Sequence, residues 1–183
     1  GYLNGVITRD DTEMVKWFGL AAEQGHAVAQ NNLGAAYARG RGVAEDLAEA
    51  ARLYRLSADQ GYAIAQSNLG SAYAEGRGLP QSDEEAAKWY RRGADQGHAR
   101  GQAHLGIFYA EGRGVARDDV QAYKWLELAI AQSAESDPAS HDELTPHRDV
   151  LAARMTPAQL QQARELIASF KPRPEPRLEV ISS

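Results

Sequence analysis

The chain has 183 residues, a formal net charge of −5 and no cysteine. This length fits one ordinary domain or a short array of repeats, and the lack of cysteine excludes disulfides, thiolate metal sites and thiol nucleophiles. The mean hydropathy is −0.52, and the absence of an apolar run of about 18 residues excludes a membrane-spanning helix. The mild acidity argues against nucleic-acid binding, which requires a basic surface to neutralise phosphates.

Residues of the same type recur every 36 positions along most of the chain. The recurring positions include Leu33, Leu69 and Leu105, then Tyr37, Tyr73 and Tyr109, then Gly40, Gly76 and Gly112. Within each repeat, apolar residues follow helical spacing, so each repeat is predicted to contain two amphipathic helices.

The pattern predicts seven helices, over residues 11–24, 27–39, 47–60, 63–75, 83–96, 99–111 and 119–133. Asp10, Asp46, Ser82 and Asp118 are expected to be N-caps, and the Glu or Gln three residues after each would complete a capping box. Glycines that follow the helices, such as Gly61 and Gly76, suit the left-handed conformation of a helix end. Glycines inside helices, at Gly34, Gly70 and Gly106, indicate close backbone approach.

The periodicity ends near residue 133, and six of the seven prolines follow. Residues 134–145 are predicted to be a connector with a helical turn after Asp137, and Thr145-Pro146 to start a helix ending near Met155. Thr156-Pro157 would start a last helix, which ends near Phe170. Its apolar face would consist of Leu160, Ala163, Ile167 and Phe170.

The predicted organisation is a partial repeat at 1–26, repeats at 27–62, 63–98 and 99–133, capping helices at 134–170 and a proline-rich tail at 171–183. The first repeat lacks its Leu-Gly helix, so we expect the sequence to be a piece of a longer protein. The tail is expected to be polyproline II over 171–176 and strand-like from Leu178 to Ile181, and to lie against a surface of its own chain or of a neighbour.

One recurring string resembles a known family. Ala-x-Ala-Gln-x-Asn-Leu-Gly-x-x-Tyr-Ala-x-Gly-x-Gly-Val at 27–43, followed by an aspartate, Ala-x-x-Leu/Trp-Tyr and Ala-x-Gln-Gly, is similar to the Sel-one-like repeat (SLR), a relative of the tetratricopeptide repeat. Residues 151–160 also resemble the closing segment of many bacterial SLR proteins. The resemblance implies an all-α, right-handed superhelix (a solenoid) of antiparallel helix pairs, with the Leu-Gly helices on its concave side. Cysteine-rich relatives staple each pair with a disulfide, which this chain cannot form.

Two kinds of polar residue have competing interpretations. Arg41, Arg77 and Arg113, in the middle of the Gly-Arg-Gly triplets, either form a ladder for an anionic peptide or are solvated loop charges. The histidine spacings do not match a metal site, and no serine has a lysine three residues later, as a penicillin-recognising enzyme would require.

The tetratricopeptide pattern, transferred column by column, predicts a protein-binding face on the Leu-Gly helices. Its candidate residues are Val28, Asn31, Asn32 and Ala35, then Ile64, Ser67, Asn68 and Ser71, then Arg100, His104 and Ile107. Asn32 and Asn68 either bond the backbone of an extended peptide or bond the backbone of the next helix of the chain itself.

The resulting prediction is a non-enzymatic adaptor that binds another protein or an extended peptide, with no cofactor, metal, nucleic acid or membrane insertion. Family members act mostly in signalling, secretion and envelope assembly, so the resemblance favours a bacterial periplasmic or envelope location. Two alternatives remain open. One is a self-assembling module that pairs through its open N-terminal end or its tail, and the other is a hydrolase of cell-wall material or β-lactams.

Overall fold

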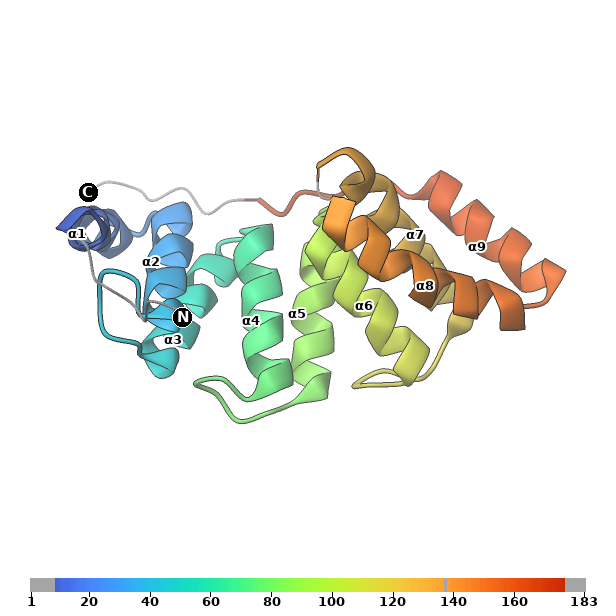
Figure 1. The fold of residues 1–183 in the computed structure, drawn as a ribbon, viewed down its shortest axis with the longest axis horizontal. Helices are drawn as coiled ribbons and strands as arrows, with labels where there is room; N and C mark the ends of the chain where they lie inside the picture. The colour runs from blue at the N-terminus through green and yellow to red at the C-terminus, as the bar shows by residue number, and fades with distance from the viewer. Residues whose placement is uncertain (1–8, 137, 177–183) are drawn as a thin grey trace, which may run out of the picture. The chain divides into compact units, whose positions relative to one another are not determined.

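The computed structural model describes residues 9–136 and 138–176, and all regular secondary structure in this part of the chain is α-helical (Figure 1). The chain divides into two compact units. Unit 1 contains the described residues up to Gln81 together with 175–176, and unit 2 is Ser82–Pro174. The two units are described separately below.

Each unit is built from helices that pack on their neighbours in chain order. Unit 1 contains α1 (Arg9–Glu23), α2 (Ala27–Arg39), α3 (Leu47–Asp59) and α4 (Ala63–Glu75). Unit 2 contains α5 (Asp83–Asp95), α6 (Ala99–Glu111), α7 (Asp119–Ser136), α8 (Pro138–Arg154) and α9 (Pro157–Ser169). The seven helices predicted from the period are confirmed as α1 to α7, each within three residues at either end.

Side-chain caps start several of these helices. Asp46 Oδ1 accepts a hydrogen bond from Glu49 N at 2.9 Å, and Ser82 Oγ accepts one from Glu85 N at 3.2 Å. Asp118 Oδ1 accepts from two amides at the start of α7, both at 3.0 Å. Asp10 differs from the prediction because α1 already begins at Arg9, so Asp10 lies within the first turn. There its carboxylate favours the helix through the macrodipole rather than as a cap.

The capping boxes are less complete than the sequence suggested. Glu49 bonds Arg52 and Glu85 bonds Lys88, in each case one turn further along the helix. The reciprocal box forms at the start of α9, where Thr156 and Gln159 each bond the other's backbone amide.

The loop after each Leu-Gly helix packs on the start of an earlier helix. In unit 2, the last glycine of the triplet, Gly114, has φ +62°, and a Cβ added there would lie 2.1 Å from the carbonyl oxygen of Asp83. In unit 1, a Cβ on Gly78 would lie 2.0 Å from the carbonyl oxygen of Leu47. Only glycine permits this contact between loop and helix, because any side chain would overlap the backbone of the helix.

The arginine of the triplet secures the same contact. Arg113 donates from Nε and Nη2 to the carboxylate of Asp83 at 3.2 and 2.8 Å, and Arg41 Nε donates to Asp11 at 2.7 Å. Each of these pairs spans 30 residues. At the corresponding position before Arg77 stands Leu47, and Arg77 instead donates to the carbonyl oxygen of Ala38 at 3.3 Å. The triplet arginines therefore tie each loop to its own chain, a role that neither sequence interpretation included.

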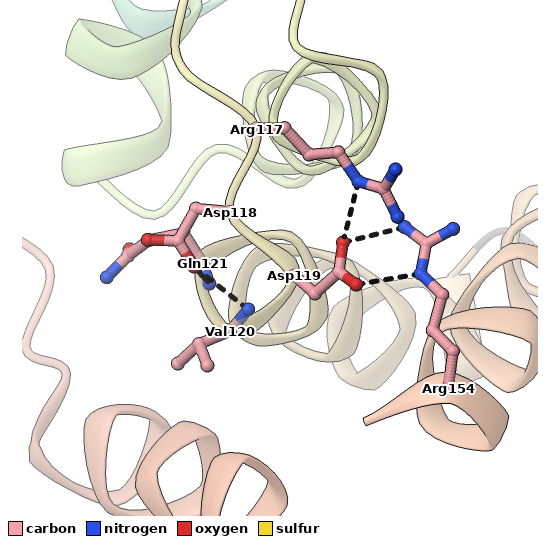
Figure 2. A network of polar contacts seen from close by, with 6 residues as sticks. All are labelled: Arg117, Asp118, Asp119, Val120, Gln121 and Arg154. Atoms are coloured by element: carbon pink, nitrogen blue, oxygen red, sulfur yellow. Dashed lines mark hydrogen bonds and ion pairs between the residues drawn. The ribbon is translucent and has the colours of Figure 1, made fainter. Parts of the chain in front are cut away.

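A similar ion pair fastens α8 to α7 (Figure 2). Arg154, at the end of α8, donates two hydrogen bonds to the Asp119 carboxylate at 2.8 and 2.7 Å, and Arg117 adds a third at 3.3 Å. These two arginines, Arg154 foremost, hold the pKa of Asp119 below its usual range. The capping helix is thus attached to the first turn of α7 much as the loop of Arg113 is attached to α5.

Helix α8 corrects the prediction for residues 134–155. It begins at Pro138 and continues through Pro146, where a separate helix was expected to start. Proline at 146 removes the amide that would bond the carbonyl of Asp142, but the helix continues on both sides. Leu144, Leu151 and Met155 are all buried against the core of unit 2, and this apolar packing outweighs the missing bond.

Buried glutamines form a polar column inside the repeats. Gln30, Gln66 and Gln102 are at most 5% exposed, and each donates to the carbonyl of an alanine eight residues earlier, at 3.2–3.4 Å. Those carbonyls lie in the last turn of the preceding helix, where intrahelical partners run out. Gln60 and Gln132 in turn donate to Gln30 and Gln102 at 2.7 and 2.8 Å. The glutamine of the recurring Ala-x-Ala-Gln string therefore closes a helix end.

Trp17, Leu53, Trp89 and Trp125 occupy the same position in successive repeats, but they differ in exposure. Leu53, Trp89 and Trp125 are buried, but Trp17 is 67% exposed. The helices α3 and α7 each pack on both of their chain neighbours, whereas α1 packs mainly on α2. One face of α1 is consequently uncovered in the described part of the chain.

Candidate functional site

In unit 1, the candidate residues of α2 and α4 surround a row of side-chain amides. Asn68 Nδ2 donates to Asn31 Oδ1 at 2.9 Å, and Asn31 Nδ2 donates to Asn32 Oδ1 at 3.3 Å. Asn31 is only 5% exposed, whereas Asn32 and Asn68 are half-buried. Asn68 thus bonds the side chain of a neighbouring helix. Neither of the two interpretations of these asparagines included this partner.

The other candidates in unit 1 differ in exposure. Val28 and Ile64 occupy equivalent positions in α2 and α4 and are 45% and 40% exposed. Ala35 and Ser71 are half-buried. Ser67 is fully buried, and its hydroxyl donates to the carbonyl of Ala63 at 3.2 Å, so it presents no group to a partner. The accessible part of this face combines two apolar side chains with amide groups.

In unit 2, all three candidates line one cleft of about 400 Å³. Arg100, His104 and Ile107 form its α6 side, and Glu143 and Leu144 of α8 contribute to the opposite side. Arg100 and Glu143 are exposed, so the cleft carries one charge of each sign. A second cleft of about 310 Å³ shares Ile107 and continues along α8, where its lining includes His147, Val150 and Arg154.

Both histidines of the first cleft are held neutral. Burial, followed by the nearby charge of Arg100, lowers the pKa of His104 to about 4 and also lowers the pKa of His98. The His104 ring stacks on Tyr90, with ring centres 4.7 Å apart. His98 Nδ1 accepts a hydrogen bond from the Gly101 amide at 3.4 Å, which places the ring proton of neutral His98 on Nε2.

The α8 side of these clefts was not found from the sequence, because Thr145-Pro146 looked like a helix start. The recurrence of Leu144, Leu151 and Met155 at helical spacing was the signal that α8 is continuous. No group of three potential metal-binding side chains occurs among the described residues. Across the same residues, no helix combines the length and apolarity needed to cross a membrane.

Comparisons with known proteins agree with this geometry. The model of the Sel1 repeat matches residues 1–26, 27–62, 63–98 and 99–133. No match was found among curated proteins.

Two solved structures are similar to the chain. One is a protective antigen present in uropathogenic Escherichia coli strains, displaying an SLR fold, with 36% identity and a TM-score of 0.77. That match covers 89% of this chain but 33% of the antigen, so the chain spans about a third of the antigen's length. The other is a Sel1 repeat protein from Oxalobacter formigenes, with 34% identity and a TM-score of 0.62, covering 76% of this chain and 99% of that one.

The comparisons and the helices together confirm an all-α fold of the helical-repeat class. Proteins with such repeats are helical scaffolds that generally serve protein–protein interaction. The chain belongs to the Sel1 repeat family.

Proposed function

We propose that this chain is a non-enzymatic scaffold that binds extended segments of another protein on its Leu-Gly helices, through one face on α6 in unit 2 and another on α2 and α4 in unit 1. The supporting observation is the cleft of unit 2, because it is lined by all three candidate residues that the sequence pattern predicts on α6, Arg100, His104 and Ile107. The lining mixes apolar residues such as Ala103, Ile107 and Leu144 with polar residues such as His98, Ser133 and Ser140, and the volume lies within the usual range of ligand-binding clefts.

The chemistry of the cleft favours a peptide with mixed character. Arg100 and Glu143 offer a cation and an anion near one another, while Ala103, Ile107 and Leu144 offer apolar surface. An extended segment would bring both backbone groups and alternate side chains to these contacts.

Unit 1 would bind in a related way through α2 and α4. Val28 and Ile64 supply exposed apolar contacts one repeat apart, and the amides of Asn32 and Asn68 lie on the same two helices.

The cellular role follows from the relatives as a proposal. One similar structure is a protective antigen of pathogenic Escherichia coli, and the family resemblance points to bacterial envelope signalling, secretion or assembly. We place the partner of this chain in that setting, in the periplasm or envelope.

Selection from a library of unstructured peptides tests the binding faces. Peptides selected on the wild-type chain are expected to lose binding to an Arg100→Glu/Ile107→Asp variant or to an Ile64→Asp variant. A Glu84→Ala variant, changed at an exposed residue of α5, is the control and should bind as the wild type does. Selected peptides that bind all three variants equally would overturn the assignment of these faces. Turnover of cell-wall fragments or β-lactams would overturn the non-enzymatic part of the proposal.

Self-association is a second candidate, favoured by the uncovered face of α1. Trp17 and Leu20 are 67% and 44% exposed on that helix. Two copies that met there would bury both side chains. Light scattering should then show dimers whose fraction rises with concentration and falls in a Trp17→Ser variant. A monomer at every concentration would exclude this candidate.

A further inference from the structure

The proline-rich segment 171–176 is neither helix nor strand, and its residues up to Pro174 belong to unit 2 whereas Glu175 and Pro176 belong to unit 1. In unit 2 it starts at Phe170, whose ring meets Trp125 edge to face with centres 5.4 Å apart. The Arg173 amide then donates to the carbonyl of Asp95 at 2.8 Å. The Pro172 ring lies over Gly97, where an added Cβ would come within 3.1 Å of it.

In unit 1 the same segment ends on an equivalent place. Glu175 Oε2 accepts a hydrogen bond at 3.0 Å from Nε2 of Gln66, a fully buried side chain. The Glu175 Cβ lies over Gly61, where an added Cβ would come within 2.9 Å of it. The described end of the tail therefore makes both a polar contact and a close backbone approach in unit 1.

Gly61 and Gly97 are the same position in successive repeats, directly after the second helix. Both have positive φ angles, of +81° and +88°, and both leave a bare backbone surface on which the tail lies. Each position is followed by a buried glutamine, Gln66 or Gln102, at the start of the next helix. We call this arrangement of turn glycine, last-turn carbonyl and buried glutamine the corner seat.

We propose that the corner seat is a binding site for extended, proline-rich segments that carry a carboxylate, and that segment 171–176 is a built-in occupant that competes with such segments of partner proteins. This surface is different from the faces of α2, α4 and α6, and the inference does not depend on them.

The contacts explain the chemistry of the occupant. In unit 2, the Pro172 ring packs on the bare backbone of Gly97. The carbonyl of Asp95, in the last turn of α5, accepts a hydrogen bond from the Arg173 amide. The sequence Lys-Pro-Arg-Pro-Glu-Pro has a proline at every second position, so it is already extended and still retains amides at Arg173 and Glu175. The buried Gln66 amide donates to the Glu175 carboxylate, and a charged acceptor makes the stronger hydrogen bond with such a donor.

Competition follows from the covalent link. A tethered segment acts at an effective concentration that reaches millimolar values for short linkers, so a free peptide of equal affinity would be largely excluded. Substitutions that weaken the binding of segment 171–176 should therefore make the corner seats accessible to a segment of a partner protein.

The test uses a fluorescent peptide with the sequence of residues 170–176 and the full chain. A tail variant, Pro172→Ser/Pro174→Ser/Glu175→Ser, is expected to bind it about tenfold more tightly than the wild type does. Adding Gly61→Asn to the tail variant should weaken binding about fivefold, because asparagine tolerates positive φ but fills the seat. Adding Gly40→Asn is the control. Its φ is +63° and its added Cβ would make only ordinary contacts, so binding should stay within about twofold.

Equal binding by wild type and tail variant, or binding unaffected by Gly61→Asn, would overturn the proposal.

A second measurement needs no tail variant. Hydrogen exchange of the Arg173 amide should be slow in the wild type, about tenfold faster with Gly97→Asn and unchanged with Gly112→Asn. Exchange unaffected by Gly97→Asn would also refute the seat. Dimers of wild type that the tail variant loses would assign the seats to the tail of a second copy and overturn competition within one chain.

Discussion

The Gly-Arg-Gly loop of unit 2 allows a sharp test of the contact between loop and helix, since its two glycines have similar backbones and different surroundings. Gly112 has φ +72° and Gly114 has φ +62°. A Cβ on Gly112 would lie 3.4 Å from the side chain of Arg117, an ordinary contact. A Cβ on Gly114 would lie 2.1 Å from the carbonyl oxygen of Asp83, which no side chain can occupy.

The free energies of unfolding of the two alanine variants should therefore differ by a few kcal/mol. Gly112→Ala costs about 1–2 kcal/mol for the left-handed backbone, offset by about 0.4–1 kcal/mol from the less flexible unfolded chain, so it should lose about 1 kcal/mol. Gly114→Ala has the same backbone cost and the same effect on the unfolded chain. In addition, the loop must move away by about 1 Å to relieve the overlap. That displacement adds about 1–3 kcal/mol of overpacking and weakens the bonds from Arg113 to Asp83. Its total loss should be about 2–4 kcal/mol.

Urea unfolding followed by circular dichroism measures both variants, and hydrogen exchange of the α5 amides localises the loss. Repeat proteins do not always unfold in one step, so the exchange data carry the comparison between variants. If both variants lost the same free energy of unfolding, positive φ alone would explain the glycines, and the close contact with α5 would not contribute.

Three further predictions test other parts of the structure. Burial lowers the pKa of His104 to about 4, so the free energy of unfolding has its full value above the unfolded pKa of about 6.5 and should fall by about 2–3 kcal/mol as the pH drops toward 4.5. His104→Asn, which copies Asn32 and Asn68, should flatten this pH profile. An unchanged slope in the variant would refute the role of the ring. Gly19 lies inside α1 and a Cβ there would meet nothing within 4 Å, so Gly19→Ala should raise the free energy of unfolding by about 0.5–1 kcal/mol, and any loss of stability in thermal melts would contradict the open surface. Leu69→Ala should cost about 2–5 kcal/mol because Leu69 is fully buried, whereas exposed Glu84→Ala should cost less than about 0.5 kcal/mol, and equal losses in urea would contradict the assigned core.

The sequence predicted those features that depend on local chemistry. Helical spacing of apolar residues predicts the positions of α2 to α7. Pairs of polar residues three apart predict the caps at Asp46 and Ser82 and the capping box at Thr156. The left-handed glycines were predictable for the same reason, since a helix end places the same demand on the backbone wherever it occurs.

The remaining features depend on contacts between distant residues. The sequence favours a helix start at Pro146, because a proline inside a helix costs one backbone hydrogen bond. The burial of Leu144 and Leu151, which outweighs this cost, depends on contacts with the rest of unit 2 and is visible only in the fold. Trp17 shares a column with buried residues, yet its exposure depends on which helices cover α1. The arginine–aspartate pairs lay within the period, at a spacing of 30, but only the structure shows that the two columns meet.

Candidate binding residues were predicted in part. Arg100, His104 and Ile107 lie together as the column transfer expected, but the opposite side of their cleft comes from α8, outside the period. Ser67 was a candidate by column and is buried, because a small hydroxyl can turn to the carbonyl of Ala63 within its own helix.

The loops that rest on earlier helix starts also bear on how such a chain can change in length. Arg113 and Asp83, like Arg41 and Asp11, are separated by 30 residues, and each pair lies within neighbouring repeats. Duplicating or deleting one 36-residue block would preserve the spacing of 30 and the glycine contacts at the new junction, with an ion pair wherever Asp rather than Leu47 stands at the helix start. An insertion of any other size would separate each arginine from its carboxylate at that point. Whole-repeat duplication is therefore the change in length that this architecture accommodates without new compensating substitutions.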